Sequence, residues 1–303
     1  MKTKDWTLFW LLGLIWGTSF LWIKIAVGEV SPIVLVGFRT LFASVGLSII
    51  VLANEKSRVG WRDIRKRLFD FAVLGTFNIA FPWLLISWAE QFIDSGLTAI
   101  LNSTMPLFTI LIAPIFISDD RITIPKVVGL ITGFLGVVIL MAPSIHSGWN
   151  NNLIAQAATL LAVLSYACAT VYARKKGRGL PPQLQAFLQL SMGATIIWIF
   201  ALFTEKPLVF PQQPLTWLAL LWLGLLGSCL AYIGYFSLLH KIGPTRMSMV
   251  TYIPPLVGII LGVVFLDEQF HWQSIFGALL ILSGISIVNL RKKAKEHLKG
   301  AEG

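Results

Sequence analysis

The sequence has 303 residues, of which 56% are hydrophobic and only 13% are charged, and its formal net charge is +10. Soluble globular domains carry charge on about a quarter of their residues, so this composition excludes an ordinary soluble domain and indicates a membrane protein. The two cysteines, Cys168 and Cys229, lie inside apolar runs. Their number and placement argue against a disulfide framework and against a metal site.

Ten apolar stretches are long enough to cross a bilayer as helices, because a span needs about 20 mostly apolar residues. The runs are too continuously apolar for the alternation of a membrane barrel. The expected spans are 6–27, 32–53, 69–90, 95–117, 124–142, 152–173, 183–203, 216–239, 244–266 and 272–290. The first lacks a signal-peptide cleavage site and is expected to be retained. The sequence therefore predicts an all-α polytopic membrane protein with short connections.

Lysine and arginine are distributed unevenly among these connections. With both termini in the cytoplasm, the cytoplasmic side holds the basic residues of 2–4, 54–68, 121–126, 174–178, 241–246 and 291–299. The opposite side then holds only Lys206. This distribution obeys the positive-inside rule. The net charge is therefore explained by topology, and no nucleic-acid partner is expected.

The chain contains an internal repeat with an offset of 148 residues, best marked by Pro106 and Pro254. The same offset places Asp119-Asp120 on Asp267-Glu268, and Gly129 and Gly136 on Gly277 and Gly284. A repeat of this length indicates duplication. Five spans per copy is an odd number, so the second copy enters the membrane from the opposite side, an arrangement that secondary transporters use. The predicted units are residues 1–149, residues 150–291 and a basic tail, 292–303.

Polar and aromatic side chains recur at helical spacing within several spans, for example Ser228, Tyr232 and Tyr235. Such stripes avoid lipid. They either join helices by hydrogen bonds or offer partners to a small organic ligand. The predicted substrate-binding residues are Trp16, Arg39, Asn78, Trp83, Trp88, Thr98, Asn102, Tyr232, Tyr235 and Tyr252.

Arg39 is one of two basic residues inside the expected spans, the other being Lys24. Lys24 can reach the interface with its long side chain. Arg39 lies deeper, and two interpretations are open. It either pairs with Glu90 at the end of the third span, or its planar guanidinium holds the carboxylate of a substrate.

Pro106 and Pro254 lie well inside spans four and nine, where a proline frees the backbone carbonyl four residues earlier. They either produce a kink that helps packing or act as hinges, and we predict hinges. The acidic pairs Asp119-Asp120 and Asp267-Glu268 are expected to form turns and caps after these spans. No acidic residue lies near the middle of a span, and no catalytic, metal-binding or cofactor motif is found, so no enzyme activity, metal or cofactor is predicted.

Several segments resemble a known family. The motif Trp16-Gly17-Thr18-Ser19-Phe20, the pair Phe38-Arg39, and the turns SDDRIT and LDEQF are similar to the EamA-type family of the drug/metabolite transporter superfamily. The resemblance implies secondary carriers, mostly bacterial exporters of amino acids or other metabolites, with a central cavity lined by spans three, four, eight and nine. The family's turn usually reads Gly-Glu-Arg, and this chain departs from it with Asp119-Asp120-Arg121 and Asp267-Glu268-Gln269.

The sequence thus predicts a multi-pass secondary transporter of the bacterial cytoplasmic membrane that exports an amino acid or related metabolite by alternating access. The alternatives are a carrier of another solute class, such as a sugar, nucleobase or drug, or a membrane enzyme acting on lipid-linked substrates. The expected partners are a small-molecule substrate and the lipid bilayer. A monomer and a homodimer are both open.

Overall fold

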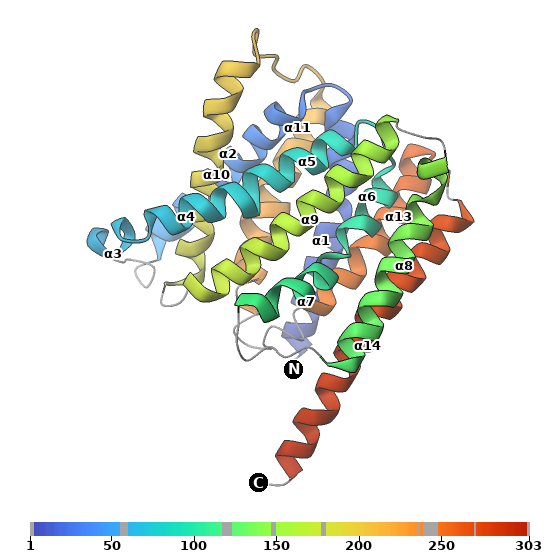
Figure 1. The fold of residues 1–303 in the computed structure, drawn as a ribbon. Helices are drawn as coiled ribbons and strands as arrows, with labels where there is room; N and C mark the ends of the chain where they lie inside the picture. The colour runs from blue at the N-terminus through green and yellow to red at the C-terminus, as the bar shows by residue number, and fades with distance from the viewer. Residues whose placement is uncertain are drawn as a thin grey trace.

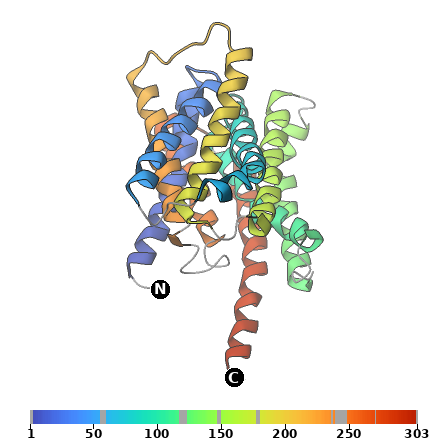
Figure 2. The same ribbon diagram turned by 90° about the vertical axis from the view of Figure 1, so that its left-hand side faces the viewer.

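The computed structural model describes residues 3–54, 60–116, 123–146, 150–176, 180–235, 237–238, 248–269 and 271–301, and all regular structure within them is helical. The helices form one elongated bundle, with the start of the first helix and the end of the last at the same end (Figures 1 and 2). The elements are α1 (Thr3–Val27), α2 (Pro32–Ala53), α3 (Trp61–Arg65), α4 (Leu68–Leu74), η2 (Gly75–Ala80), α5 (Phe81–Ala89), α6 (Ser95–Asn102), α7 (Met105–Phe116), α8 (Ile124–His146), α9 (Asn151–Lys176), α10 (Pro182–Thr204), α11 (Pro214–Leu221), η3 (Trp222–Leu230), η4 (Ser248–Tyr252), α13 (Ile253–Leu266) and α14 (Trp272–Ala301).

Within these residues, eight helical stretches are long and apolar enough to cross a membrane: Thr3–Val27, Pro32–Ala53, Leu68–Ala89, Ser95–Phe116, Ile124–His146, Asn151–Ala173, Pro182–Thr204 and Pro214–Tyr235. Val250–Leu266 and Trp272–Ile287 are shorter apolar helices. Large apolar side chains such as Ile49, Phe203 and Phe265 are exposed on the outside of the bundle. Lipid would cover such side chains, and the prediction of a multi-pass membrane protein is confirmed. The number of ten spans stays a prediction.

The helices α8 and α14 pack against each other along most of their apolar length (Figure 1). Glycines allow this close approach, because a Cβ atom on Gly136 would lie 2.6 Å from the carbonyl oxygen of Gly277. A Cβ atom on Gly284 would meet the carbonyl oxygen of Gly129. The contacts run in opposite directions along the two chains, so the helices are antiparallel.

Two stretches of π-helix interrupt the α-helical spans, η2 between α4 and α5 and η3 after α11. Adding 148 to the bounds of η2 gives 223–228, which lies inside η3 (222–230). A π-helical turn bonds i to i+5 and often marks a functional site. In η3 the Ser228 hydroxyl donates to the carbonyl oxygen of Leu223, five residues earlier, at 2.8 Å.

One end of the bundle is formed by the connections 28–31, 90–94 and 205–213 together with residues 267–269 and 271, and we name it the distal end. Here Glu268 caps α6, because its carboxylate accepts from the backbone N–H of Ser95 at 2.7 Å and of Gly96 at 3.1 Å. Lys24 joins α1 to the 90–94 connection by donating to the carbonyl oxygens of Glu90 at 2.7 Å and Ile93 at 2.8 Å. The expectation that Glu268 forms a cap is therefore confirmed, while Asp119 and Asp120 lie outside the described residues.

A second acidic side chain caps a helix at this end. Glu29 accepts from the backbone N–H of Gln212 at 2.5 Å and of Gln213 at 3.0 Å, just before α11. A hydrogen bond with the Thr216 side chain, together with those from the two N–H groups, lowers the pKa of Glu29 below its ordinary value. Negative charge at a helix N-terminus also suits the helix dipole.

Candidate functional site

Arg39 lies in the interior of the bundle, on α2. The preceding residue, Phe38, holds this turn of the helix in place. The Phe38 ring makes edge contacts with Trp198 and Trp217, at centroid distances of 5.4 and 5.2 Å. These contacts anchor α2 against α10 and α11. Arg39 itself is 7% exposed, and its guanidinium carbon lies 3.7 Å from the ring centroid of Trp83 on α5. Such a cation–π contact is worth about 2 kcal/mol or more when it is shielded from water.

Ser228 on η3 also contacts the guanidinium. The Arg39 Nε donates to the Ser228 Oγ at 3.1 Å, while the Ser228 hydroxyl donates to Leu223. Gly224 makes this approach possible, since a Cβ atom there would lie 2.6 Å from the Cβ of Phe42 on α2. The glycine and the π-helical turn together bring the serine to the arginine.

Two tyrosines complete this environment. Tyr166 on α9 and Tyr232 after η3 both lie close to Arg39, and the Tyr166 hydroxyl also lies within reach of the Trp83 side chain. We refer to Arg39, Trp83, Tyr166, Ser228 and Tyr232 as the Arg39 site. It brings together three of the predicted substrate-binding residues from different spans.

Of the two interpretations of Arg39, a hydrogen-bonded pair with Glu90 is not formed among the described residues, although the two charged groups lie near enough to interact. Among the described residues, Arg39 makes its hydrogen bond to Ser228, and neither carboxylate oxygen of Glu90 has a hydrogen-bond partner. Stacking on Trp83 fixes the guanidinium plane instead. The site therefore presents a buried cation without a bonded carboxylate, and a buried charge without a counter-charge is costly.

Three other predicted residues make contacts between helices in two separate groups. Asn78 on η2 donates from Nδ2 to the Oε1 of Gln189 on α10, at 3.1 Å. Trp16 on α1 donates from Nε1 to the carbonyl oxygen of Gly227 at 3.2 Å, and its ring lies 5.7 Å from that of Tyr235. These contacts join helices, which fits the packing interpretation as well as the binding one.

The remaining predicted residues belong to other groups of side chains. Trp88 and Tyr252 belong to a different apolar cluster, with Phe92 and Leu97. Thr98 is fully buried and donates to the carbonyl oxygen of Asp94 in its own helix, at 3.0 Å. Asn102 ends α6, and its Oδ1 is buried without a hydrogen-bond partner among the described residues.

Pro106 and Pro254 stand at helix starts after a break and not in the middle of continuous helices. The α-helix ends at Asn102 and resumes at Met105, so Pro106 is the second residue of α7. Likewise Pro254 is the second residue of α13, directly after the 3₁₀ turn η4. Proline is favoured in the first turn of a helix, where its missing N–H is not needed. The hinge role stays a prediction.

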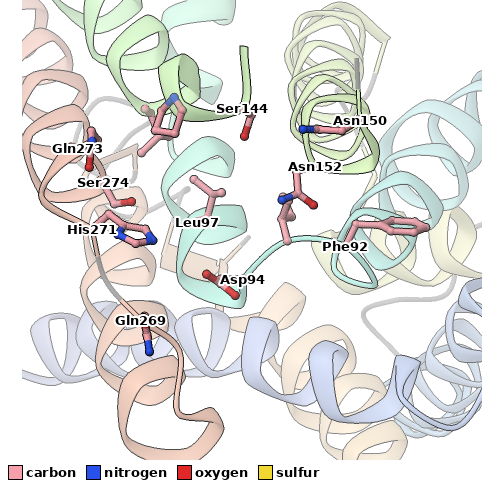
Figure 3. Close-up of a pocket in the computed structure, with 13 residues that line it drawn as sticks. Phe92, Asp94, Leu97, Ser144, Asn150, Asn152, Gln269, His271, Gln273 and Ser274 are labelled. Atoms are coloured by element: carbon pink, nitrogen blue, oxygen red, sulfur yellow. The ribbon is translucent and has the colours of Figure 1, made fainter. Parts of the chain in front are cut away.

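A cavity of about 260 Å³ opens at the distal end (Figure 3). Its polar lining comes from four segments, with Asp94, Ser144, Asn152 and His271 among the side chains that face it. Burial and the neighbouring Glu268 raise the pKa of the Asp94 carboxyl above its ordinary value. None of the predicted substrate-binding residues lines this cavity.

Sequence reasoning missed two residues near the predicted ones. Tyr166 and the buried Gln189 lie on spans six and seven, in which no polar stripe was identified. Both residues are polar groups within apolar runs, and polar groups in a span are rarely left facing lipid. This was the one feature of the sequence that could have identified them.

Comparisons with known proteins agree with this architecture. The profile of the EamA-like transporter family matches residues 6–142 and 153–290. An uncharacterized transporter of Archaeoglobus fulgidus is 27% identical over 96% of this chain and 100% of its own length. The protein PecM of Dickeya dadantii is 29% identical, over 97% of both chains. YedA of Escherichia coli, an uncharacterized inner membrane transporter, is 27% identical over 83% of this chain and 79% of its own length.

One solved crystal structure superposes with a TM-score of 0.67 at 19% sequence identity, covering 96% of this chain and 98% of that chain. At this identity the likeness concerns the fold alone.

Proposed function

The chain belongs to the EamA-like transporter family, and from this premise we propose that it is a secondary carrier that exports an amino acid or a related carboxylate metabolite by alternating access. Its substrate is a small molecule, its setting is the cell membrane, and it carries out no chemical conversion.

The observation that carries the substrate class is the Arg39 site. Within the described part of the chain, the guanidinium uses Nε for Ser228 and one face for Trp83. A planar guanidinium binds a carboxylate through two parallel N–H groups, and a dry site strengthens that bond. A substrate carboxylate would supply a hydrogen-bonded counter-charge. The rings of Trp83, Tyr166 and Tyr232 would contact the apolar part of the same molecule.

An inverted repeat of five spans per half explains the packing. Under the offset of 148, the contact of Gly136 with Gly277 maps onto that of Gly284 with Gly129, so one antiparallel interface repeats itself. The pair α1 with α13 maps in the same way onto α9 with α7. The two stretches matched by the family profile support the same division into 1–149 and 150–291, followed by the basic tail 292–303. Both termini then lie in the cytoplasm, and the distal end faces outward.

The contacts at the distal end correspond to an outward-closed conformation. α13 packs closely on α6, with Gly258 against Ala99 and Gly262 against Ser95. Glu268 ties the end of α13 to α6, and Lys24 ties α1 to the connection that precedes α6. Opening would separate α6 from α13, and the breaks before Pro106 and Pro254 give each helix a place to bend.

The test is counterflow uptake into proteoliposomes, with labelled amino acids, other carboxylates, sugars and nucleobases in one panel. We expect saturable uptake of a carboxylate by the wild type. Arg39→Ala should lose it, while Arg62→Ala, which removes an exposed arginine, should retain it. Saturable uptake of a sugar or nucleobase instead, unaffected by Arg39→Ala, would contradict the proposed substrate class.

A further inference from the structure

Glu90 is the most deeply buried carboxylate in the described part of the chain. It follows α5 at the distal end, is 0% exposed, and neither of its side-chain oxygens has a hydrogen-bond partner. Five of the eight buried, unpartnered side-chain atoms among the described residues lie between 87 and 102: Ser87 Oγ, both Glu90 oxygens, Ser95 Oγ and Asn102 Oδ1. Unsatisfied polar atoms are thus concentrated around the connection between α5 and α6.

An ionised carboxylate in this position would lose its hydration and gain no hydrogen bond in return. That cost is several kcal/mol for an isolated charge, and proteins usually avoid it by neutralising the group. A protonated carboxyl leaves only a neutral O–H and C=O unsatisfied. The geometry therefore favours the protonated form of Glu90 in this conformation.

Three charged groups on other elements face Glu90: Lys24 of α1, Arg39 of α2 and Glu268 after α13. The helix α9, which also packs on α5, has no charged residue in the half that reaches the distal end. The two cations are already engaged, since Lys24 is bonded to two carbonyl oxygens and Arg39 to Ser228. Lys24 can bond the Glu90 carboxylate only after its contacts rearrange, and no hydrogen bond joins Arg39 to Glu90 in this conformation.

We propose that Glu90 is a proton-binding site, occupied while the distal end is closed and emptied when Lys24 and Glu268 release their contacts. The proton comes from water on the distal side, and the only bond formed or broken is the O–H bond of the carboxyl group. This proposal rests on the proposed carrier function. If Glu90 binds a proton each time the distal end closes, transport by the carrier is coupled to proton movement.

A proton fits this site better than a sodium ion. Sodium needs several oxygen ligands at once, and the carbonyl oxygens of Glu90 and Ile93 that could contribute are bonded to Lys24.

The first test is infrared spectroscopy of the full chain, reconstituted in lipid, during a titration from acidic to alkaline pH. We expect the carbonyl stretching band of a protonated carboxyl group to persist at neutral pH. It should shift on labelling with carboxyl-¹³C glutamate and disappear in Glu90→Gln. The exposed control Asp63→Asn should retain it. Because glutamine resembles the protonated acid in shape, this variant should fold. A wild type without this band, or a band that sodium chloride but not choline chloride removes, would overturn the proposal.

The second test links the proton to the distal end through amide hydrogen exchange of residues 90–97. The N–H groups of Ser95 and Gly96 are protected by Glu268 in the closed conformation. After correction for intrinsic exchange, protection in the wild type should fall as the pH rises through the titration of the infrared band. In Glu90→Gln it should not change with pH. The same pH response in both proteins would refute the coupling.

Neither test needs a substrate, so the two proposals can fail separately. A chain that transports a solute but lacks the glutamate band refutes the proton site alone. The converse result, a glutamate band without counterflow, supports the proton site and refutes the carrier function.

Discussion

Replacing Glu268 by alanine removes both acceptors that cap α6. The N–H groups of Ser95 and Gly96 lie 2.7 and 3.1 Å from the two carboxylate oxygens, and both residues are buried. Water therefore cannot easily replace the lost bonds. A hydrogen bond to a charged group contributes about 1.5–3 kcal/mol, and a helix cap about 0.5–2 kcal/mol, so we expect a total loss of about 2–5 kcal/mol.

Thermal unfolding of the purified protein, followed by circular dichroism, measures this loss. A loss of this size should lower the Tm of Glu268→Ala by roughly 3–8 °C, because the entropy of unfolding of a chain of 303 residues is about 0.6 kcal/mol/K. Glu268→Gln should lie between this variant and the wild type, because its amide oxygen accepts one bond while its NH₂ group faces the other N–H. The exposed neighbour Gln269 provides the control, and Gln269→Ala should leave the Tm unchanged. If Glu268→Ala and Gln269→Ala have the same Tm, the cap does not stabilise the distal end and the reasoning is refuted.

Three further predictions concern other parts of the bundle. Gly136→Ala should destabilise the protein by about 1–3 kcal/mol, because its Cβ would lie 2.6 Å from a backbone oxygen of α14. The control is Val138→Ala at an exposed position, and equal Tm values for the two variants would refute the close packing. The pKa of Glu29 is lowered by Thr216 and two N–H groups, so its stabilising effect is present above the unfolded pKa and is lost as the pH falls through the folded value. The Tm difference between wild type and Glu29→Gln should therefore shrink on acidification, and a difference independent of pH would contradict the cap. Asn102→Ala and Tyr232→Phe should impair counterflow while leaving the Tm nearly unchanged, whereas wild-type transport by both would mark these residues as packing contacts.

The spans could be predicted from the sequence because lipid imposes a simple requirement. A helix must be apolar over its whole length, and the predicted start and end of the third span, 69–90, differ from Leu68–Ala89 by one residue each. The breaks within spans were harder to place. Proline at position 106 signalled an interruption, but local sequence does not distinguish a kinked helix from an ending at Asn102 and a new start at Met105.

The candidate site was predicted only in part, since its contacts join residues far apart in the chain. Arg39, Trp83 and Tyr232 were identified as polar or aromatic groups within spans, and the structure places them together. Tyr166 was missed because its position on α9 belongs to no polar stripe. The hydrogen-bond partner of Arg39 was not predicted. Charge pairing suggested Glu90 as one of two interpretations, whereas the π-helical turn of η3 and the small Gly224 bring Ser228 to the guanidinium.

The most direct test of the account is competition in counterflow, with wild-type proteoliposomes and the labelled solute that they accumulate. If Arg39 recognises a carboxylate, the unlabelled solute should compete, and its carboxamide analogue, which has the same shape but no negative charge, should fail to do so. Equal competition by the acid and the amide would show that the carboxylate is not recognised, and would contradict the role of the Arg39 site.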